Sequence, residues 1–187
     1  MGKQIQWYPG HMAKTIRDFE ETTKKVDMFF VLLDARAPLS SFVDSIKQIV
    51  NNKKVTIVLT KADLVKQDEL KQWIEYFKKS YENVIPVSLQ KRDQAYSKIM
   101  QTLKASNLKA LLPKFAIIGI PNVGKSTLLN IMKKKSSAVA EDRAGVTKSS
   151  TWYQVEEKYW LLDTPGILQP SFNSDNQAIA LAAIGSI

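Results

Sequence analysis

Short apolar runs alternate with amphipathic stretches along most of the chain. The apolar runs predict buried strands at residues 28–33, 55–59, 84–87, 115–120 and 159–162. Apolar residues at helical spacing predict helices at residues 42–50, 69–78, 94–103, 126–132 and 176–184. Alternation of this kind is typical of the α/β class. We therefore expect a mainly parallel sheet with helices on both faces.

Three segments fall outside this simple alternation. The more polar run at 149–155 predicts a strand paired antiparallel with 159–162 across a turn at 156–158, as an edge hairpin. Residues 105–113 end in a proline that cannot continue a helix, which indicates a join between two halves of the domain. The lysine run at 133–135 suits the C-terminal end of a helix, so we assign it a structural role.

The charge balance narrows the choice of partner. The chain has 187 residues, enough for one α/β domain, with 27 lysines and arginines against 18 acidic residues and a net charge of +9. This excess favours a phosphate-rich partner, with nucleic acid as the first candidate. The alternative is that the lysines only keep the surface soluble. Because there is no cysteine, disulfides and thiolate metal sites are excluded.

The chain shows no sign of a membrane segment. Its longest apolar run, at 28–33, is far shorter than the roughly 20 residues of a membrane helix. The amino terminus lacks the apolar core of a signal peptide. We therefore expect a cytoplasmic protein with no membrane partner.

Residues 119–126 read G-I-P-N-V-G-K-S and fit the phosphate-loop pattern G-x-x-x-x-G-K-[ST] at every fixed position. They follow a predicted strand and open a predicted helix, which argues against a chance glycine-rich turn. The lysine would bring charge to the β and γ phosphates, and the serine would ligate magnesium. The nucleotide-binding residues expected here are Asn122, Val123, Gly124, Lys125, Ser126 and Thr127.

Two later segments have the character of switches. In Asp163-Thr-Pro-Gly166, the carboxylate of Asp163 can hold magnesium and the Gly166 amide can sense the γ-phosphate. In the polar loop at 143–148, Thr147 is the candidate to close onto the metal. A threonine in a loop is also commonly a cap or turn residue. The predicted switches are therefore 143–148 and 163–167.

Thr60-Lys61-Ala62-Asp63 ends a predicted strand and resembles the guanine-specificity motif Asn-Lys-x-Asp. The Asp63 carboxylate would accept hydrogen bonds from N1 and N2 of guanine, which adenine cannot supply. The stem of Lys61 would cover one face of the base. Thr60 stands in the usual place of asparagine, and we expect it to do less for the base edge and for holding the phosphate loop.

Ser88 and Leu89 follow the next predicted strand and resemble the Ser-Ala-Lys element, whose backbone N–H reads guanine O6. A serine after a strand can equally be a turn or a cap. These base motifs, at 60–63 and 88–89, precede the phosphate loop at 119–126. Since the usual order is the reverse, the sequence predicts a circularly permuted P-loop GTPase domain.

These motifs in this order, with Trp7-Tyr-Pro-Gly-His11-Met-Ala-Lys14 and Asp34-Ala-Arg36, resemble the bacterial ribosome biogenesis GTPase A family over essentially the whole chain. The resemblance implies a cytoplasmic factor that binds GTP and GDP and promotes late maturation of the large ribosomal subunit, through its ribosomal RNA and proteins. Hydrolysis would be slow until the particle stimulates it. The resemblance also implies a carboxyl-terminal RNA-binding domain in the family, and we expect none of it within these 187 residues.

The resemblance also implies an arrangement of parts. We expect a monomer in which residues 1–25 pack on a GTPase domain at 26–187. Ile167 stands where classical GTPases carry a water-orienting glutamine. The resemblance suggests His11 as a catalytic residue beside Lys125, or a metal-ion solution. Asn122 is similar to the potassium-coordinating asparagine of cation-activated GTPases, so the expected cofactors are Mg²⁺ and K⁺.

A function of another class stays open. Because Ile167 can neither donate nor accept a proton, the chain could be a nucleotide-gated RNA-binding module in which hydrolysis is incidental. Turnover that rises with large-subunit particles would favour the enzyme. State-dependent binding without stimulation would favour the module.

Overall fold

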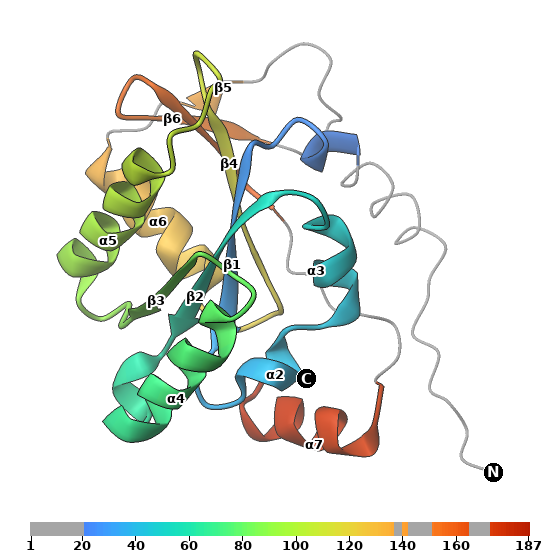
Figure 1. The fold of residues 1–187 in the computed structure, drawn as a ribbon. Helices are drawn as coiled ribbons and strands as arrows, with labels where there is room; N and C mark the ends of the chain where they lie inside the picture. The colour runs from blue at the N-terminus through green and yellow to red at the C-terminus, as the bar shows by residue number, and fades with distance from the viewer. Residues whose placement is uncertain (1–20, 137–139, 142–150, 165–172) are drawn as a thin grey trace.

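The computed structural model describes residues 21–136, 140–141, 151–164 and 173–187 (Figure 1). In these residues seven strands form one sheet, in the order β3-β2-β1-β4-β7-β6-β5. The strands are β1 (Met28–Asp34), β2 (Lys54–Thr60), β3 (Asn83–Val87), β4 (Lys114–Gly119), β5 (Ala140–Glu141), β6 (Trp152–Val155) and β7 (Tyr159–Leu162). Pairing is parallel from β3 through to β7, and β6 and β5 continue antiparallel.

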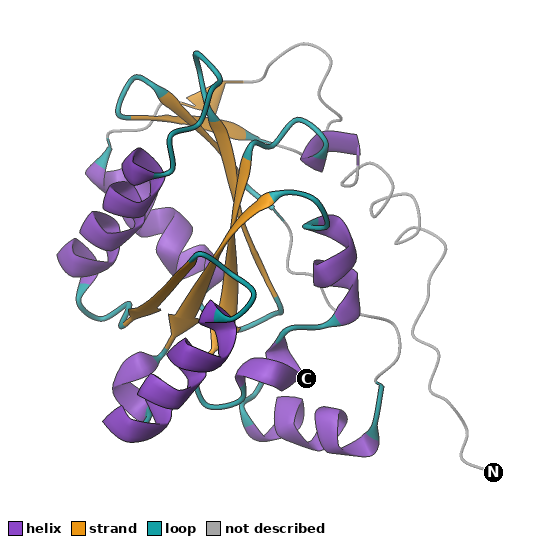
Figure 2. Cartoon of the chain, viewed as in Figure 1, coloured by secondary structure: helices purple, strands orange, loops and turns teal. Residues whose placement is uncertain are grey.

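Helices cover both faces of this sheet (Figures 1 and 2). They are α2 (Pro38–Ser41), α3 (Asp44–Ile49), α4 (Gln67–Lys78), α5 (Arg92–Ala105), α6 (Lys125–Lys135) and α7 (Asp175–Ala183), with a 3₁₀ turn η1 (Ala62–Leu64). Helices α5 and α6 contact each other on one face, and α2 contacts α7 on the other. The expected mainly parallel α/β sheet with helices on both faces is confirmed.

The centre of the molecule is β1, which lies between β2 and β4 and is buried at all seven positions. A parallel strand covered by helices on both faces meets apolar neighbours on each side, which explains its apolar sequence from Met28 to Leu33. The T-shaped contact of Phe30 with Phe115, at 5.8 Å between ring centroids, joins β1 to β4. The two halves of the chain therefore share one core.

Two predicted elements need correction. The expected helix at 42–50 is the shorter α3, which begins only after Val43 in extended conformation (ψ 154°), and a separate helix that the sequence did not predict, α2, precedes it. The hairpin of β6 and β7 forms as expected, with its turn at 156–158, but it is not the edge of the sheet. The two-residue strand β5 pairs with β6 beyond it. A strand so short carries no hydrophobic periodicity.

Parallel pairing brings the predicted motifs together. In the register of the sheet, Asp34 at the end of β1 pairs with Thr60 at the end of β2, and Leu32 pairs with Gly119 at the end of β4. The carboxyl ends of parallel strands meet at one edge, where ligands of open α/β sheets bind. The base motif and the phosphate loop therefore lie side by side although 59 to 66 positions separate Thr60 from residues 119–126.

Candidate functional site

The phosphate loop joins β4 to α6 and requires its two glycines. A Cβ atom at Gly119 would come within 2.8 Å of Val123 Cγ1 and 3.0 Å of the Leu32 carbonyl oxygen. Gly124 has φ 105°, and a Cβ there would meet Leu89 Cδ1 at 2.5 Å. The loop can therefore pack this closely only without side chains at these positions.

Between the loop and the first turn of α6 lies a hollow of about 540 Å³. Its lining residues are Ile120, Pro121, Asn122, Gly124, Lys125, Ser126 and Thr127. Ser126 and Thr127 are exposed at the helix N-terminus, where backbone N–H groups and the helix dipole favour an anion. The hollow therefore has the place and the polarity of a phosphate site.

Lys125 connects this hollow with the segment after β7. Its ammonium donates a hydrogen bond to the backbone carbonyl of Thr164. Burial lowers the pKa of Lys125, with Asp163 acting against that shift and Lys133 adding to it. The structure thus brings together two of the predicted phosphate-site residues, Lys125 and Asp163.

Thr60 holds the phosphate loop directly. Its hydroxyl is fully buried, donates to the Val123 carbonyl oxygen at 2.8 Å, and lies 3.1 Å from the Leu33 carbonyl oxygen. The sequence predicts a weaker hold from threonine than from asparagine, yet this threonine makes the bond across 63 positions. The base motif and the phosphate loop are therefore coupled through one side chain.

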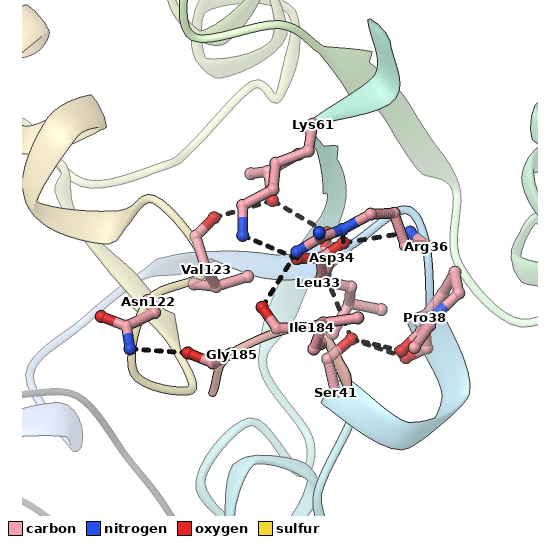
Figure 3. A network of polar contacts seen from close by, with 12 residues as sticks. Leu33, Asp34, Arg36, Pro38, Ser41, Lys61, Asn122, Val123, Ile184 and Gly185 are labelled. Atoms are coloured by element: carbon pink, nitrogen blue, oxygen red, sulfur yellow. Dashed lines mark hydrogen bonds and ion pairs between the residues drawn. The ribbon is translucent and has the colours of Figure 1, made fainter. Parts of the chain in front are cut away.

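A buried carboxylate, Asp34, to which the sequence motifs give no role, organises the base side (Figure 3). Asp34 is 0% exposed and accepts from the Arg36 backbone N–H at 3.0 Å, from Arg36 Nε at 2.9 Å and from Arg36 Nη2 at 2.8 Å. Lys61 Nζ lies 2.8 Å from the same carboxylate. Burial alone would raise the pKa of Asp34, but the hydrogen bonds from Arg36 and Lys61 lower it.

The sequence contained a signal for Asp34, namely a charged residue directly after a long buried strand. The sequence position of Asp34 did not, however, predict which side chains pair with it. Lys61, which the sequence assigns to the base, adopts a left-handed conformation with φ 54° and pairs with Asp34. The aspartate thus fixes where the lysine of the base motif lies.

The segment just after α7 contacts Arg36, the partner of Asp34, and the phosphate loop. Arg36 Nη2 donates to the Ile184 carbonyl oxygen at 3.0 Å, and Asn122 Nδ2 donates to the Gly185 carbonyl oxygen at 2.7 Å (Figure 3). Both carbonyls lie just past the last residue of α7, Ala183. One donor follows β1 and the other belongs to the phosphate loop, so this segment is held from both sides.

The other predicted base residues lie at the same edge. Asp63 is exposed in η1, directly after β2, while Ala62 beside it is buried. Ser88 and Leu89 follow β3 and are half-buried. Leu89, a departure from the Ser-Ala-Lys pattern, places its side chain against Gly124 of the phosphate loop.

Some predicted residues fall outside the described part of the chain: His11, Thr147, Gly166 and Ile167. Their roles stay predictions. For magnesium, the described residues supply a hydroxyl at Ser126 and a carboxylate at Asp163, both hard oxygen ligands. In the structure the Asp163 carboxylate is paired with Lys133 Nζ at 3.0 Å.

Nowhere in the described residues do three or more His, Cys, Asp or Glu side chains form a group suited to a metal ion. In P-loop sites the nucleotide phosphates supply much of the coordination, so one hydroxyl and one carboxylate fit the pattern. The same residues contain no helix that is long and apolar enough to cross a membrane.

Comparison with known proteins gives consistent matches. Residues 114–184 match the family described as "50S ribosome-binding GTPase". Ribosome biogenesis GTPase A of Bacillus licheniformis is 38% identical over 98% of this chain and 68% of its own length. The protein of that name from Bacillus cereus is 42% identical, and this chain spans 65% of its length.

The fold has solved relatives as well. The structure of GNP-bound YlqF from Thermotoga maritima matches with a TM-score of 0.70 and 28% identity, covering 93% of this chain and 66% of that one. A GDP-bound YlqF structure matches with a TM-score of 0.69 and 30% identity. The permuted order of the motifs, which meet at one edge of the sheet, agrees with these similarities. The chain therefore belongs to the ribosome biogenesis GTPase A family of circularly permuted P-loop GTPases.

Proposed function

We propose that this protein binds GTP and GDP, hydrolyses GTP, and acts as an assembly factor for the large ribosomal subunit whose affinity for the particle changes with nucleotide state. The observation that carries the proposal is the direct bond between base motif and phosphate loop, Thr60 to Val123, at the edge where β1, β2 and β4 end. The family membership and the net charge of +9 support a ribosomal RNA partner.

On this proposal each motif has one task. Asp63 accepts from the guanine edge, Lys61 covers the base, and Lys125 with the loop amides binds the phosphates. Ser126 and Asp163 would hold a magnesium ion, which would neutralise phosphate charge. Outside the described residues, Thr147 would close onto the metal and Gly166 would sense the γ-phosphate.

The remaining expectations form part of the same proposal. The GTPase domain comprises residues 26–187, and the amino-terminal segment 1–25 packs on it. The burial of Thr22 and Thr23, 5% and 4% exposed, supports that packing. The protein would work in the cytoplasm as a monomer. Its second candidate function, a nucleotide-gated RNA-binding module with incidental hydrolysis, rests on Ile167 at the position of the usual glutamine.

Steady-state GTP turnover separates the two functions. We expect slow hydrolysis by the protein alone and a rise of at least about 10-fold with purified large subunits, since partner groups complete such sites. Lys125→Ala should abolish it, because the phosphate charge is lost. Particle binding that depends on nucleotide without any rise in turnover would overturn the enzyme and support the module.

Water activation can be assigned with His11→Ala in potassium and in sodium salts. If His11 orients the attacking water, the variant should bind GTP normally and lose roughly 100-fold of its particle-stimulated rate. If Asn122 also holds potassium against the phosphates, wild-type turnover should fall in sodium while GDP affinity is kept. Full stimulated rates in His11→Ala, or equal rates in both salts, would remove that group from the mechanism.

Base choice is expected to depend on Asp63. Asp63→Asn should lower GTP affinity by about 100-fold or more and gain xanthosine triphosphate binding, because the amide reverses one hydrogen bond. Asp68→Asn, the same change at an exposed position of α4, is the matched control. Fluorescent-nucleotide titrations measure both. GTP affinity unchanged in Asp63→Asn would contradict the assignment of the base pocket.

The coupling through Thr60 is also testable. Thr60→Val should lower GDP affinity about tenfold, because a buried carbonyl of the phosphate loop loses its donor. Thr56→Val is the control, since Thr56 is equally buried on β2 but its hydroxyl has no hydrogen-bond partner among the described residues. Calorimetric GDP titrations compare the two. Equal affinity in both variants would show that the bond does not support nucleotide binding.

A further inference from the structure

Three consecutive lysines end α6, and the structure gives each a different environment. Lys134 is exposed, and Lys135 pairs with Asp93 of α5 at 2.5 Å. Lys133 turns toward the sheet, where its side chain is only 23% exposed. The sequence assigns the whole run a structural role at the helix C-terminus. For Lys133 that role is incomplete, because its side chain also contacts the sheet.

Lys133 is held by two groups from neighbouring strands. Its Nζ lies 3.0 Å from Asp163 Oδ2, just after β7, and 3.7 Å from the centroid of the Tyr153 ring on β6. Burial would lower the pKa of Lys133, but Tyr153 and Asp163 raise it. The ammonium therefore has two partners, a carboxylate and an aromatic face, and keeps the second if the first is withdrawn.

Asp163 is the carboxylate that the proposed function gives to magnesium. It lies near the phosphate hollow: Lys125, which lines the hollow, donates a hydrogen bond to the carbonyl of the next residue, Thr164. Its Oδ2 oxygen already accepts from Lys133. A carboxylate oxygen engaged by an ammonium is a poorer ligand for a second cation, since the two positive charges repel at this distance.

We propose that Lys133 is a positioning residue that competes with magnesium for Asp163 and so sets the Mg²⁺ concentration at which the protein retains its nucleotide. The inference rests on the proposed nucleotide site. When Asp163 turns to the metal, the Lys133 ammonium stays on the Tyr153 ring. When the metal leaves, Lys133 neutralises the carboxylate, which keeps Asp163 from repelling nucleotide phosphates.

The test is the Mg²⁺ dependence of fluorescent GDP binding in four proteins: wild type, Lys133→Met, Lys133→Arg and Lys134→Met. Lys133→Met should lower the half-saturating Mg²⁺ concentration about fivefold, the effect of removing one partly exposed ion pair. Lys133→Arg keeps a cation on Asp163 and should stay near wild type. Lys134→Met removes the same charge one residue away and should also stay near wild type.

Two outcomes overturn the inference. An unchanged Mg²⁺ requirement in Lys133→Met would mean that the ion pair does not compete, and an increased one would mean that Lys133 helps Asp163 to bind metal. GDP affinity at saturating Mg²⁺ shows that each variant is folded, and Lys133→Gln repeats the test if Lys133→Met is not. Absence of GDP binding by the wild type would instead refute the proposed function.

Discussion

The nucleotide edge of this protein depends on a buried negative charge. Asp34 is removed from water at the end of β1, and an isolated carboxylate there would be costly. Arg36 and Lys61 compensate it with hydrogen-bonded positive charges. Because breaking such a pair leaves an unpaired buried charge, the three side chains must stay together. The lysine of the base motif and the arginine that reaches Ile184 are thereby fixed to one point of the sheet.

Circular permutation leaves this geometry unaffected. A parallel sheet needs β1 between β2 and β4 and needs their carboxyl ends at one edge, but the order in which the chain visits the strands is free. The bond from Thr60 to Val123 and the contact of Leu89 with Gly124 join the early half of the chain to the later half. The site is therefore assembled from both halves, and neither could form it alone.

Two lysines of α6 bring positive charge to the end of β7, and each has a different partner there. Lys125 reaches the backbone after β7, and Lys133 reaches Asp163 from the far end of the same helix. Both contacts converge on two consecutive residues, Asp163 and Thr164. The phosphate loop, the end of β7 and β6 with Tyr153 are thus linked through α6. A change in the partner of Asp163 would therefore also change the contacts that α6 makes with the sheet.

The sequence alone determined most of the strands and helices and the identity of the motifs, because periodicity and motif spacing are local properties of the chain. It also determined the permutation, since motif order is read directly. The tertiary structure decided which side chains pair: Asp34 with Lys61, Thr60 with Val123, Lys133 with Asp163. It decided as well that β5 extends the sheet. These pairings join residues distant along the chain, and only the register of neighbouring strands and helices brings them within hydrogen-bonding distance.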